Sequence, residues 1–332
     1  MRKLLALPIL AAIVWSGWWV VAQQGITRGI DTWLQAREGE GWQAEAEVAT
    51  RGFPLTLETR LTDLALADPD TGLAWNAPVF SFTAAAYAPT RVTATWPETQ
   101  TIASPFERIE IRSQTMQGFL GLVPGPNLAL DDSDITLEHL TFASTAGWTA
   151  ALASGSLVTR RLDEDPLAHD IRFATRDLEP AAPLLRIIDP TGLLPQVIAE
   201  MTLEARVAFD APWDRRAIED RRPQITRLEL EGASARWGDM ALDAAGSLTV
   251  DPKGTPEGRI TIRATNWRDM VAVARASGSL PEGIADTLER GLEILAGLTG
   301  NPRTIDAPLS FQNGFVSLGP IPLGRAPAFV IR

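Results

Sequence analysis

Apolar side chains recur at every second position between Ile225 and Trp267, and this alternation limits the possible fold more than any other feature of the 332-residue chain. Leu228 and Leu230 form a first apolar run, which precedes a turn-like stretch rich in Gly, Ser and Arg. Three further runs follow, and the last contains Ile260 and Ile262. Period-two alternation broken by turn residues is typical of antiparallel strands with one buried and one wet face. The segment predicts a four-strand meander.

The same pattern occurs twice more in the chain, which indicates an internal repeat. A clear second copy covers Ile135–Phe173, and a fainter third copy covers Leu55–Phe82. Self-similar segments of this kind predict stacked supersecondary units that share a continuous core. The other interpretation is chance resemblance between meanders rich in Ala, Gly, Leu and Thr. The matched positions of the first two copies are Trp148 with Trp237, Gly155–Leu157 with Gly246–Leu248, and Ile171 with Ile260.

An uncharged apolar run near the N-terminus predicts a membrane segment. Leu4–Ala22 contains 19 residues and would span roughly 28 Å as a helix, close to the thickness of a hydrocarbon core. Arg2 and Lys3 precede it, so the N-terminus is expected in the cytoplasm and the body in the periplasm, attached to the inner membrane. A cleaved signal peptide is the alternative, since Val20 and Ala22 suit the −3 and −1 positions.

The predicted fold class is mostly β with minor α, in the following order. Residues 1–24 form the membrane anchor, 25–45 a juxtamembrane helix, and 46–332 an exported β-rich body. Repeat units are expected at about 55–100, 135–200 and 202–298, with a closing hairpin at 305–332 around Asn313-Gly314. Helical segments are predicted at 179–200 and 266–298, the second capped by Asn266, and 115–126 is predicted to be a packed loop.

Composition narrows the functional classes. The formal net charge is −11, with 30 Lys and Arg against 41 Asp and Glu, which argues against nucleic acid as a partner. The chain has no Cys, so disulfides and thiolate metal sites are excluded, but the compartment is not thereby fixed.

No motif for catalysis or cofactor binding is evident in the sequence. His139 and His169 are the only histidines, and both are expected at the surface or at a strand edge because a metal site needs more converging ligands. Asp131, Asp132 and Asp134 lack the Gly and closing Glu of a calcium loop. We therefore predict a non-enzyme with no cofactor, no metal and no catalytic residues.

Tryptophan is the one residue type whose placement suggests a binding site. The chain has 11 Trp but a single Tyr. Trp75, Trp148 and Trp237 fall at equivalent points of the three repeats, where they could line an apolar groove for an acyl chain. The alternative interpretation is that each indole fills the core at a hairpin bend.

Several short motifs resemble a bacterial family. Arg51-Gly52-Phe53-Pro54, Gly72–Pro78, Gly246–Gly258 and Gly319–Gly324 are similar to the alphaproteobacterial family called domain of unknown function 2125. More distantly, the N-terminal anchor and repeated β body resemble the AsmA-like envelope proteins, some of which are implicated in lipid transport. The resemblance implies location and architecture, and it supplies no site residues.

Two functions follow as expectations. The first is binding of lipid or another apolar ligand in envelope homeostasis. The second is a non-enzymatic scaffold that binds envelope proteins through a strand edge or through the helix 282–298, in which Ile284, Leu288, Leu292 and Leu295 form an apolar stripe.

Overall fold

The chain folds as two compact, mostly β units, and the first of them includes a long N-terminal helix. The structure is a computed structural model that describes residues 2–280, 282–299 and 301–331, with side chains described except at 2–8, 218–219, 282–284, 295 and 298–299. The first unit contains residues 1–122 and 139–147, and the second contains 123–138 and 148–332. The predicted fold class, an antiparallel meander body after an apolar helix, is confirmed.

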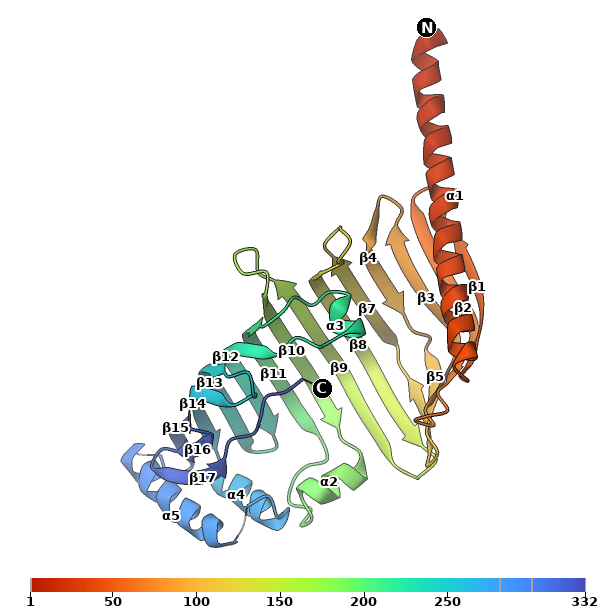
Figure 1. Cartoon of the computed structure of the whole chain (residues 1–332). Coiled ribbons are helices and arrows are strands. Elements are labelled where there is room, and N and C mark those ends of the chain that lie inside the picture. The colour runs from red at the N-terminus through yellow and green to blue at the C-terminus, as the bar shows by residue number, and fades with distance from the viewer. Residues whose placement is uncertain (1, 281, 300, 332) are drawn as a thin grey trace. The chain divides into compact units, whose positions relative to one another are not determined.

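Helix α1 (Arg2–Gly39) is continuous through the predicted anchor and most of the predicted juxtamembrane helix, which ends at Gly39 and not at residue 45 because β1 begins at Gln43. Of the described helices it is the one long and apolar enough to cross a membrane, over Ile9–Gly39. Its later turns lie along the sheet of the first unit (Figure 1), where Trp19 is buried with Leu57 and Ala86. The helix is therefore both a candidate membrane segment and part of the core of this unit.

The first unit is an antiparallel sheet in which β3 pairs with three partners. Strand β3 pairs with β2 along its length, with β4 at its C-terminal half and with β5 at its N-terminal end. Beyond these, β4 pairs with β7, β5 pairs with β6, and β6 pairs with the end of β8. The strands are β1 (Gln43–Arg51), β2 (Thr56–Ala67), β3 (Ala74–Ala85), β4 (Ala88–Thr95), β5 (Thr99–Ala103), β6 (Arg108–Arg112), β7 (Thr115–Leu122) and β8 (Leu130–Ser144), of which the second unit shares β8.

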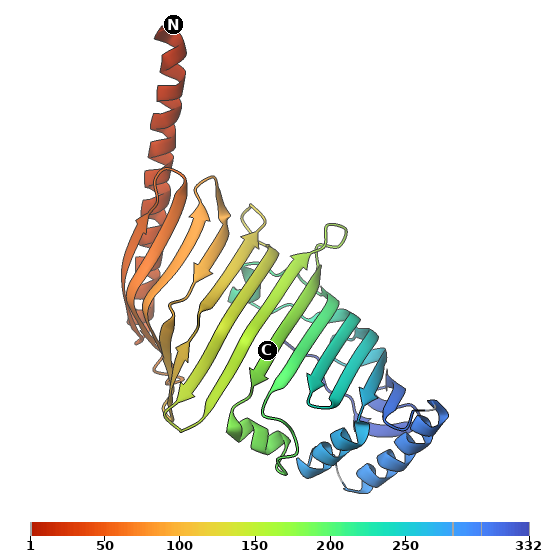
Figure 2. The ribbon, with the colours of Figure 1, turned by 180° about the vertical axis from the view of Figure 1, so that it is seen from behind.

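The second unit is an unbroken antiparallel meander from β9 to β17, seen from behind in Figure 2. Its strands are β9 (Thr149–Arg161), β10 (Ala168–Glu179), β11 (Ile198–Phe209), β12 (Ile225–Trp237), β13 (Met240–Val250), β14 (Pro256–Thr265), β15 (Thr304–Gln312), β16 (Phe315–Leu318) and β17 (Ile321–Arg325). Its helices are α2 (Ala182–Ile188), α3 (Arg216–Glu219), α4 (Trp267–Ala276) and α5 (Glu282–Thr299).

The main core of the second unit lies where α4 and α5 cover the strands near its C-terminal end. Trp267, only 1% exposed, packs with Leu292 of α5 and Ile305 of β15. The predicted stripe of α5 is thus directed into the core, because Leu288 and Leu292 are buried there. The side chains of Ile284 and Leu295 lie outside the described residues.

Three local predictions are corrected by the structure. The meander at 225–267 has three strands and not four, because the stretch after Leu230 is a bulge inside β12 and the real turn follows Trp237 at Gly238. Residues 115–126 are not a loop throughout, since β7 pairs with β4. Asn266 precedes α4 as predicted but makes no side-chain cap hydrogen bond.

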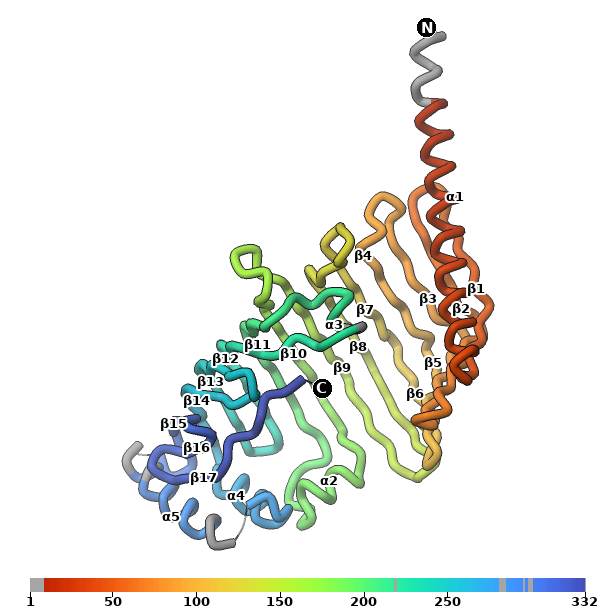
Figure 3. The backbone as a smooth tube through the Cα atoms, in the orientation of Figure 1, coloured from red at the N-terminus to blue at the C-terminus, as the bar shows by residue number. Residues whose placement is uncertain are grey.

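The closing hairpin is confirmed. Asn313 and Gly314 both have positive φ, as a two-residue turn between antiparallel strands requires, and they join β15 to β16. The Pro-containing segment that follows forms the short strand β17 on β16. After β17 the chain turns back, as the tube in Figure 3 shows, and Ile331 packs against the β11–β12 core.

Candidate functional site

A row of apolar side chains crosses seven strands of the second unit. In the strand register, Leu157 of β9 pairs with Phe173 of β10, and Phe173 pairs with Leu203 of β11. Pairing continues without interruption into the strands covered by the helices. We call this set the apolar row: Leu157, Phe173, Leu203, Ala233, Ala244, Ile262 and Ala307. At about 4.8 Å per strand it is roughly 29 Å long.

The neighbouring row on the same face is also mostly apolar. Ile171, Ala205 and Leu230 pair across β10–β12, and Ile260 and Leu309 continue the row across β14 and β15. Residues two apart along a regular strand share a face. In β12 the bulge after Leu230 brings Leu230 and Ala233, which are three residues apart, into the same apolar cluster. The face is therefore a continuous apolar surface and not a single line of contacts.

The opposite face of the same strands is charged and internally paired. Arg206 of β11 bonds Asp170 of β10 at 2.8 Å, and Arg263 of β14 bonds Asp306 of β15 at 3.0 Å. Such partly exposed pairs contribute at most about 1 kcal/mol each. Their effect here is to give the sheet two chemically different faces, one of which suits hydrocarbon.

The apolar face is covered unevenly. Helices α4 and α5 pack over its β13–β17 side (Figure 1), and Ile331 of the C-terminal segment packs against the β11–β12 core. Leu157, Phe173 and Leu203 at the β9–β11 side remain partly exposed. We call these three residues the open end of the apolar row.

His169 is buried on β10 four residues before Phe173, which corrects the prediction that it lies at the surface or at a strand edge. It is only 3% exposed and its ring packs edge-on against Phe209 at 5.9 Å. Neither ring nitrogen makes a hydrogen bond of normal geometry. Burial lowers the pKa of His169, so the neutral imidazole is favoured. His139, in contrast, is exposed as predicted.

The three predicted tryptophans do not form one groove within the second unit. Trp148 precedes β9 and Trp237 ends β12, so they stand three strands apart, about 14 Å, and are offset along the strands. Trp75 belongs to the first unit, where its indole N–H donates to Gln100 Oε1 at 2.7 Å. Its ring packs on Phe80 at 5.3 Å in an aromatic cluster of that unit. Their role in ligand binding stays a prediction.

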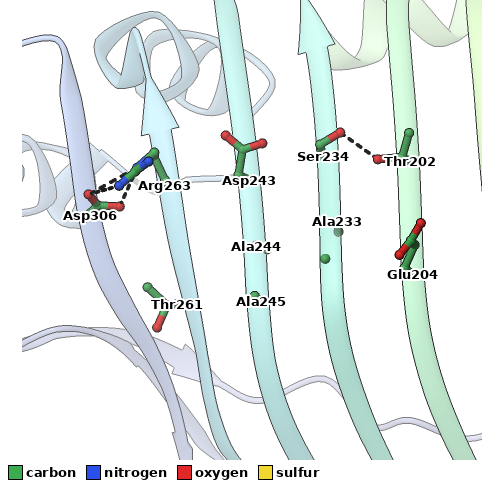
Figure 4. A pocket seen from close by; sticks show the side chains of 11 residues that line it. Thr202, Glu204, Ala233, Ser234, Asp243, Ala244, Ala245, Thr261, Arg263 and Asp306 are labelled. Atoms are coloured by element: carbon green, nitrogen blue, oxygen red, sulfur yellow. Dashed lines mark hydrogen bonds and ion pairs between the residues drawn. The ribbon is translucent and has the colours of Figure 1, made fainter.

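A polar depression of about 540 Å³ lies across β11–β15 (Figure 4). Its one cation is already paired, since Arg263 bonds Asp306, and Thr202 shares a 2.7 Å hydrogen bond with Ser234. Small residues form the rest of its floor. This surface offers neither free cations nor an apolar lining, so it is a poor candidate for an acyl chain.

A second hollow of about 430 Å³ includes one predicted residue, Trp237. The indole N–H of Trp237 donates to the carbonyl of Pro195 at 2.8 Å, which fixes the loop before β11 against the end of β12. Leu193 and Val273 line the same hollow, with Asp239 and Asp269 also in its wall. The hollow is separate from the open end of the apolar row.

A metal site has no support in the described part of the chain. Among those residues no group of three or more His, Asp or Glu is placed to hold a metal ion. Asp131 and Asp132, considered above for a calcium loop, pair with Arg161 and Arg160 of β9.

The alternation of apolar residues in the sequence is consistent with the open end of the apolar row but does not predict its position. Phe173 and Leu203 stand in strand-like runs, but which residues pair across β9–β11 depends on the lengths of the intervening turns and helices. The sequence prediction concentrated on Trp and so missed these smaller side chains.

Fold and surface together define a class: an antiparallel β-meander protein whose N-terminal apolar helix could serve as a membrane anchor or a signal sequence. The chain belongs to the family described as "Uncharacterized protein conserved in bacteria (DUF2125)", which it matches over residues 19–327. No curated protein and no solved structure matches it.

Proposed function

We propose that the protein is anchored in the bacterial inner membrane by α1 and binds an acyl chain or a similar apolar ligand on the exported body. The observation that carries the proposal is the open end of the apolar row. Partly exposed Leu157, Phe173 and Leu203 are contiguous with a buried apolar face, whereas the other face of the same strands is charged. A hydrocarbon chain that covers the open end would gain about 25 cal/mol of binding free energy for each Å² of apolar surface removed from water.

Retention of α1 is supported by its packing. Cleavage after Ala22 would remove Trp15 and Trp19 and would uncover Leu57 and Ala86, which are 2% and 1% exposed. A cleaved signal peptide is absent from the mature protein, so its side chains would not be expected in the core. The anchored form, with Arg2 and Lys3 on the cytoplasmic side, is therefore the form we propose. The resemblance to AsmA-like envelope proteins agrees with this location.

The experiment is a titration of the full chain with a fluorescent fatty acid, after transfer from detergent into an amphipathic polymer. We expect saturable binding that unlabelled fatty acid competes away, and native mass spectrometry should show a bound lipid mass. Absence of both signals would overturn the ligand-binding proposal.

A scaffold for envelope proteins is the alternative. Of its two predicted routes, the α5 stripe has Leu288 and Leu292 buried against the sheet, which leaves the strand edge at β17 as the better candidate. Crosslinking in cells discriminates the two functions, because a reproducible protein partner crosslinked at β17, with no bound lipid, would favour the scaffold.

A further inference from the structure

The body is attached to α1 so far along the helix that the free part is too short to cross a bilayer. Trp15 donates its indole N–H to the carbonyl of Pro54 at 2.9 Å, and Trp19 donates to the carbonyl of Thr56 at 2.9 Å. Trp18 donates to the carbonyl of Ala86 at 3.3 Å. Residues 2–14, which precede these contacts, make about 20 Å of helix, whereas a hydrocarbon core is about 30 Å thick.

The missing length is present in α1, but it lies beside the body. The uncharged run continues to Ala22, and Val20 and Val21 on the outer side of the helix stay exposed. If this run spans the hydrocarbon, its last turns enter the membrane together with whatever touches them. Positions 15–19 stand three to seven residues before the end of the run, which is about 5–10 Å of helix.

The elements that touch these turns are two strand turns with exposed apolar tips. The β1–β2 turn presents Phe53 and Leu55, which are 54% and 62% exposed, and the β3–β4 turn presents Tyr87, which is 75% exposed. Figure 1 shows α1 continuing beyond the ends of β1–β4 at these turns. Phe53 also touches Trp19 of the core, whereas Leu55 and Tyr87 belong to neither of the apolar clusters described for the first unit.

Charge is excluded from the same zone. No residue of 4–27, 52–57 or 72–90 is Asp, Glu, Lys or Arg. Next to the turns, α1 carries an apolar hollow lined by Leu10, Ala11, Val14, Trp15 and Trp18. Trp and Tyr favour the membrane–water interface, where an apolar ring and a polar group are both accommodated. The zone thus has the composition of an interfacial belt.

We propose that Phe53, Leu55 and Tyr87, which we call the rim, insert into the outer leaflet of the membrane that α1 crosses. The rim rests on the membrane anchoring proposed above and adds a second contact to it. Insertion of the rim would hold the first unit against the lipid surface at two turns as well as at the helix. The β1–β2 turn is also tied to the helix itself, because Trp19 packs edge-on against Phe53 at 5.4 Å. Insertion to about 5–10 Å is the depth at which interfacial segments bury apolar side chains.

The absence of Cys from the chain allows a direct test by single-cysteine labelling. Leu55→Cys and Tyr87→Cys replace exposed side chains and leave the core intact. Each full-length variant is labelled with an environment-sensitive fluorophore and reconstituted into vesicles of phosphatidylcholine and phosphatidylglycerol. Quenching by a lipid nitroxide placed near the glycerol backbone is compared with quenching by aqueous iodide.

Two further positions serve as controls. Phe106→Cys labels an aromatic residue that is 93% exposed in the β5–β6 turn, at the end of the first-unit sheet opposite to the rim. Leu10→Cys reports whether α1 itself is in the bilayer. We expect lipid quenching at Leu10, Leu55 and Tyr87 that is severalfold stronger than at Phe106, and the reverse order with iodide.

The possible failures are distinguishable. Lipid quenching at Leu10, with iodide quenching at Leu55 and Tyr87 equal to that at Phe106, would overturn the rim and leave the anchor standing. Iodide quenching at Leu10 as well would overturn the anchor together with the rim. Neither result bears on fatty-acid binding by the second unit, which is measured separately.

Discussion

Replacement of Leu203 by Asp tests the apolar row at its open end. The substitution places a carboxylate between Phe173 and Ala233, where the proposed ligand would lie. Thr202→Asp is the matched control, because Thr202 is the adjacent residue of β11 and its side chain is on the polar face, hydrogen-bonded to Ser234. The two variants have the same added charge on the same strand, so only the face differs.

The expected loss of affinity follows from two contributions. A Leu side chain that is covered by a ligand contributes about 1.5–3 kcal/mol. A carboxylate left without a partner beneath hydrocarbon costs about 1–3 kcal/mol more. Together these give roughly 2.5–6 kcal/mol, or an increase in Kd of about sixtyfold to more than ten-thousandfold for Leu203→Asp. Thr202→Asp should change Kd by less than about threefold, since surface substitutions usually stay within 0.5 kcal/mol.

The assay is fluorescent fatty-acid titration of each full-length variant at a temperature where circular dichroism shows it folded. This condition matters because Leu203 also contacts the β11–β12 core. Equal affinities for wild type and Leu203→Asp would refute the placement of the ligand on the apolar row. An equal loss in both variants would show that net charge, not the face, controls binding.

Three further predictions concern the stability of the second unit, measured by chemical denaturation. His169→Phe should reduce the loss of stability between pH 7 and pH 5. Burial holds the pKa of His169 in the folded state below the ordinary 6.5, so only the unfolded chain takes up a proton there as the pH falls. Identical pH dependence of the unfolding free energy in variant and wild type would contradict this. Gly246→Ala should destabilise the protein by more than about 2 kcal/mol, because φ is +154° and a methyl group would lie 2.3 Å from the carbonyl oxygen of Arg259. Gly232→Ala, with open space around it, should change the stability by no more than about 0.5 kcal/mol. A similar loss of stability at both positions would be inconsistent with strain at Gly246. Trp267→Ala should destabilise by about 3–5 kcal/mol, and a loss below 1 kcal/mol would mean that the indole is not central to the core.

Strand-forming character was predictable from alternation, but strand ends were not. The run of Ile225–Trp237 has one bulge near Gly232, and in the sequence this Gly is indistinguishable from a turn residue. Only pairing with β13 shows that the strand continues. Likewise β7 is rich in Gly, and it is a strand because β4 pairs with it, which is a tertiary effect outside local propensity.

Burial of single polar residues was also beyond sequence reasoning. His139 and His169 both stand in strand patterns near acidic residues, yet one is exposed and the other is buried. The difference arises because His169 shares a face with Val207 and packs on Phe209, and that face is set by the β10–β11 register. A slip of one residue in register would exchange the two faces.

Sequence and structure point to different residues for a candidate apolar site, and a ligand-binding role stays a prediction for both sets. An apolar surface on a repeated β body was expected, with Trp75, Trp148 and Trp237 as its residues. Trp237 instead closes a hollow by bonding the Pro195 carbonyl, and Trp75 belongs to an aromatic cluster of the first unit. Large indoles are conspicuous in a sequence, whereas a row of Leu, Phe and Ala becomes visible only when seven strands are in register.

Photo-crosslinking with a diazirine-bearing fatty acid tests the central proposal most directly. The full chain is irradiated with the probe bound, digested, and mapped by mass spectrometry. Modified peptides should contain Leu157, Phe173 or Leu203, and excess unlabelled fatty acid should abolish the signal. Labelling confined to α1 or to the charged face around Arg206 and Asp306, with none on β9–β11, would contradict the proposal that this sheet holds an acyl chain.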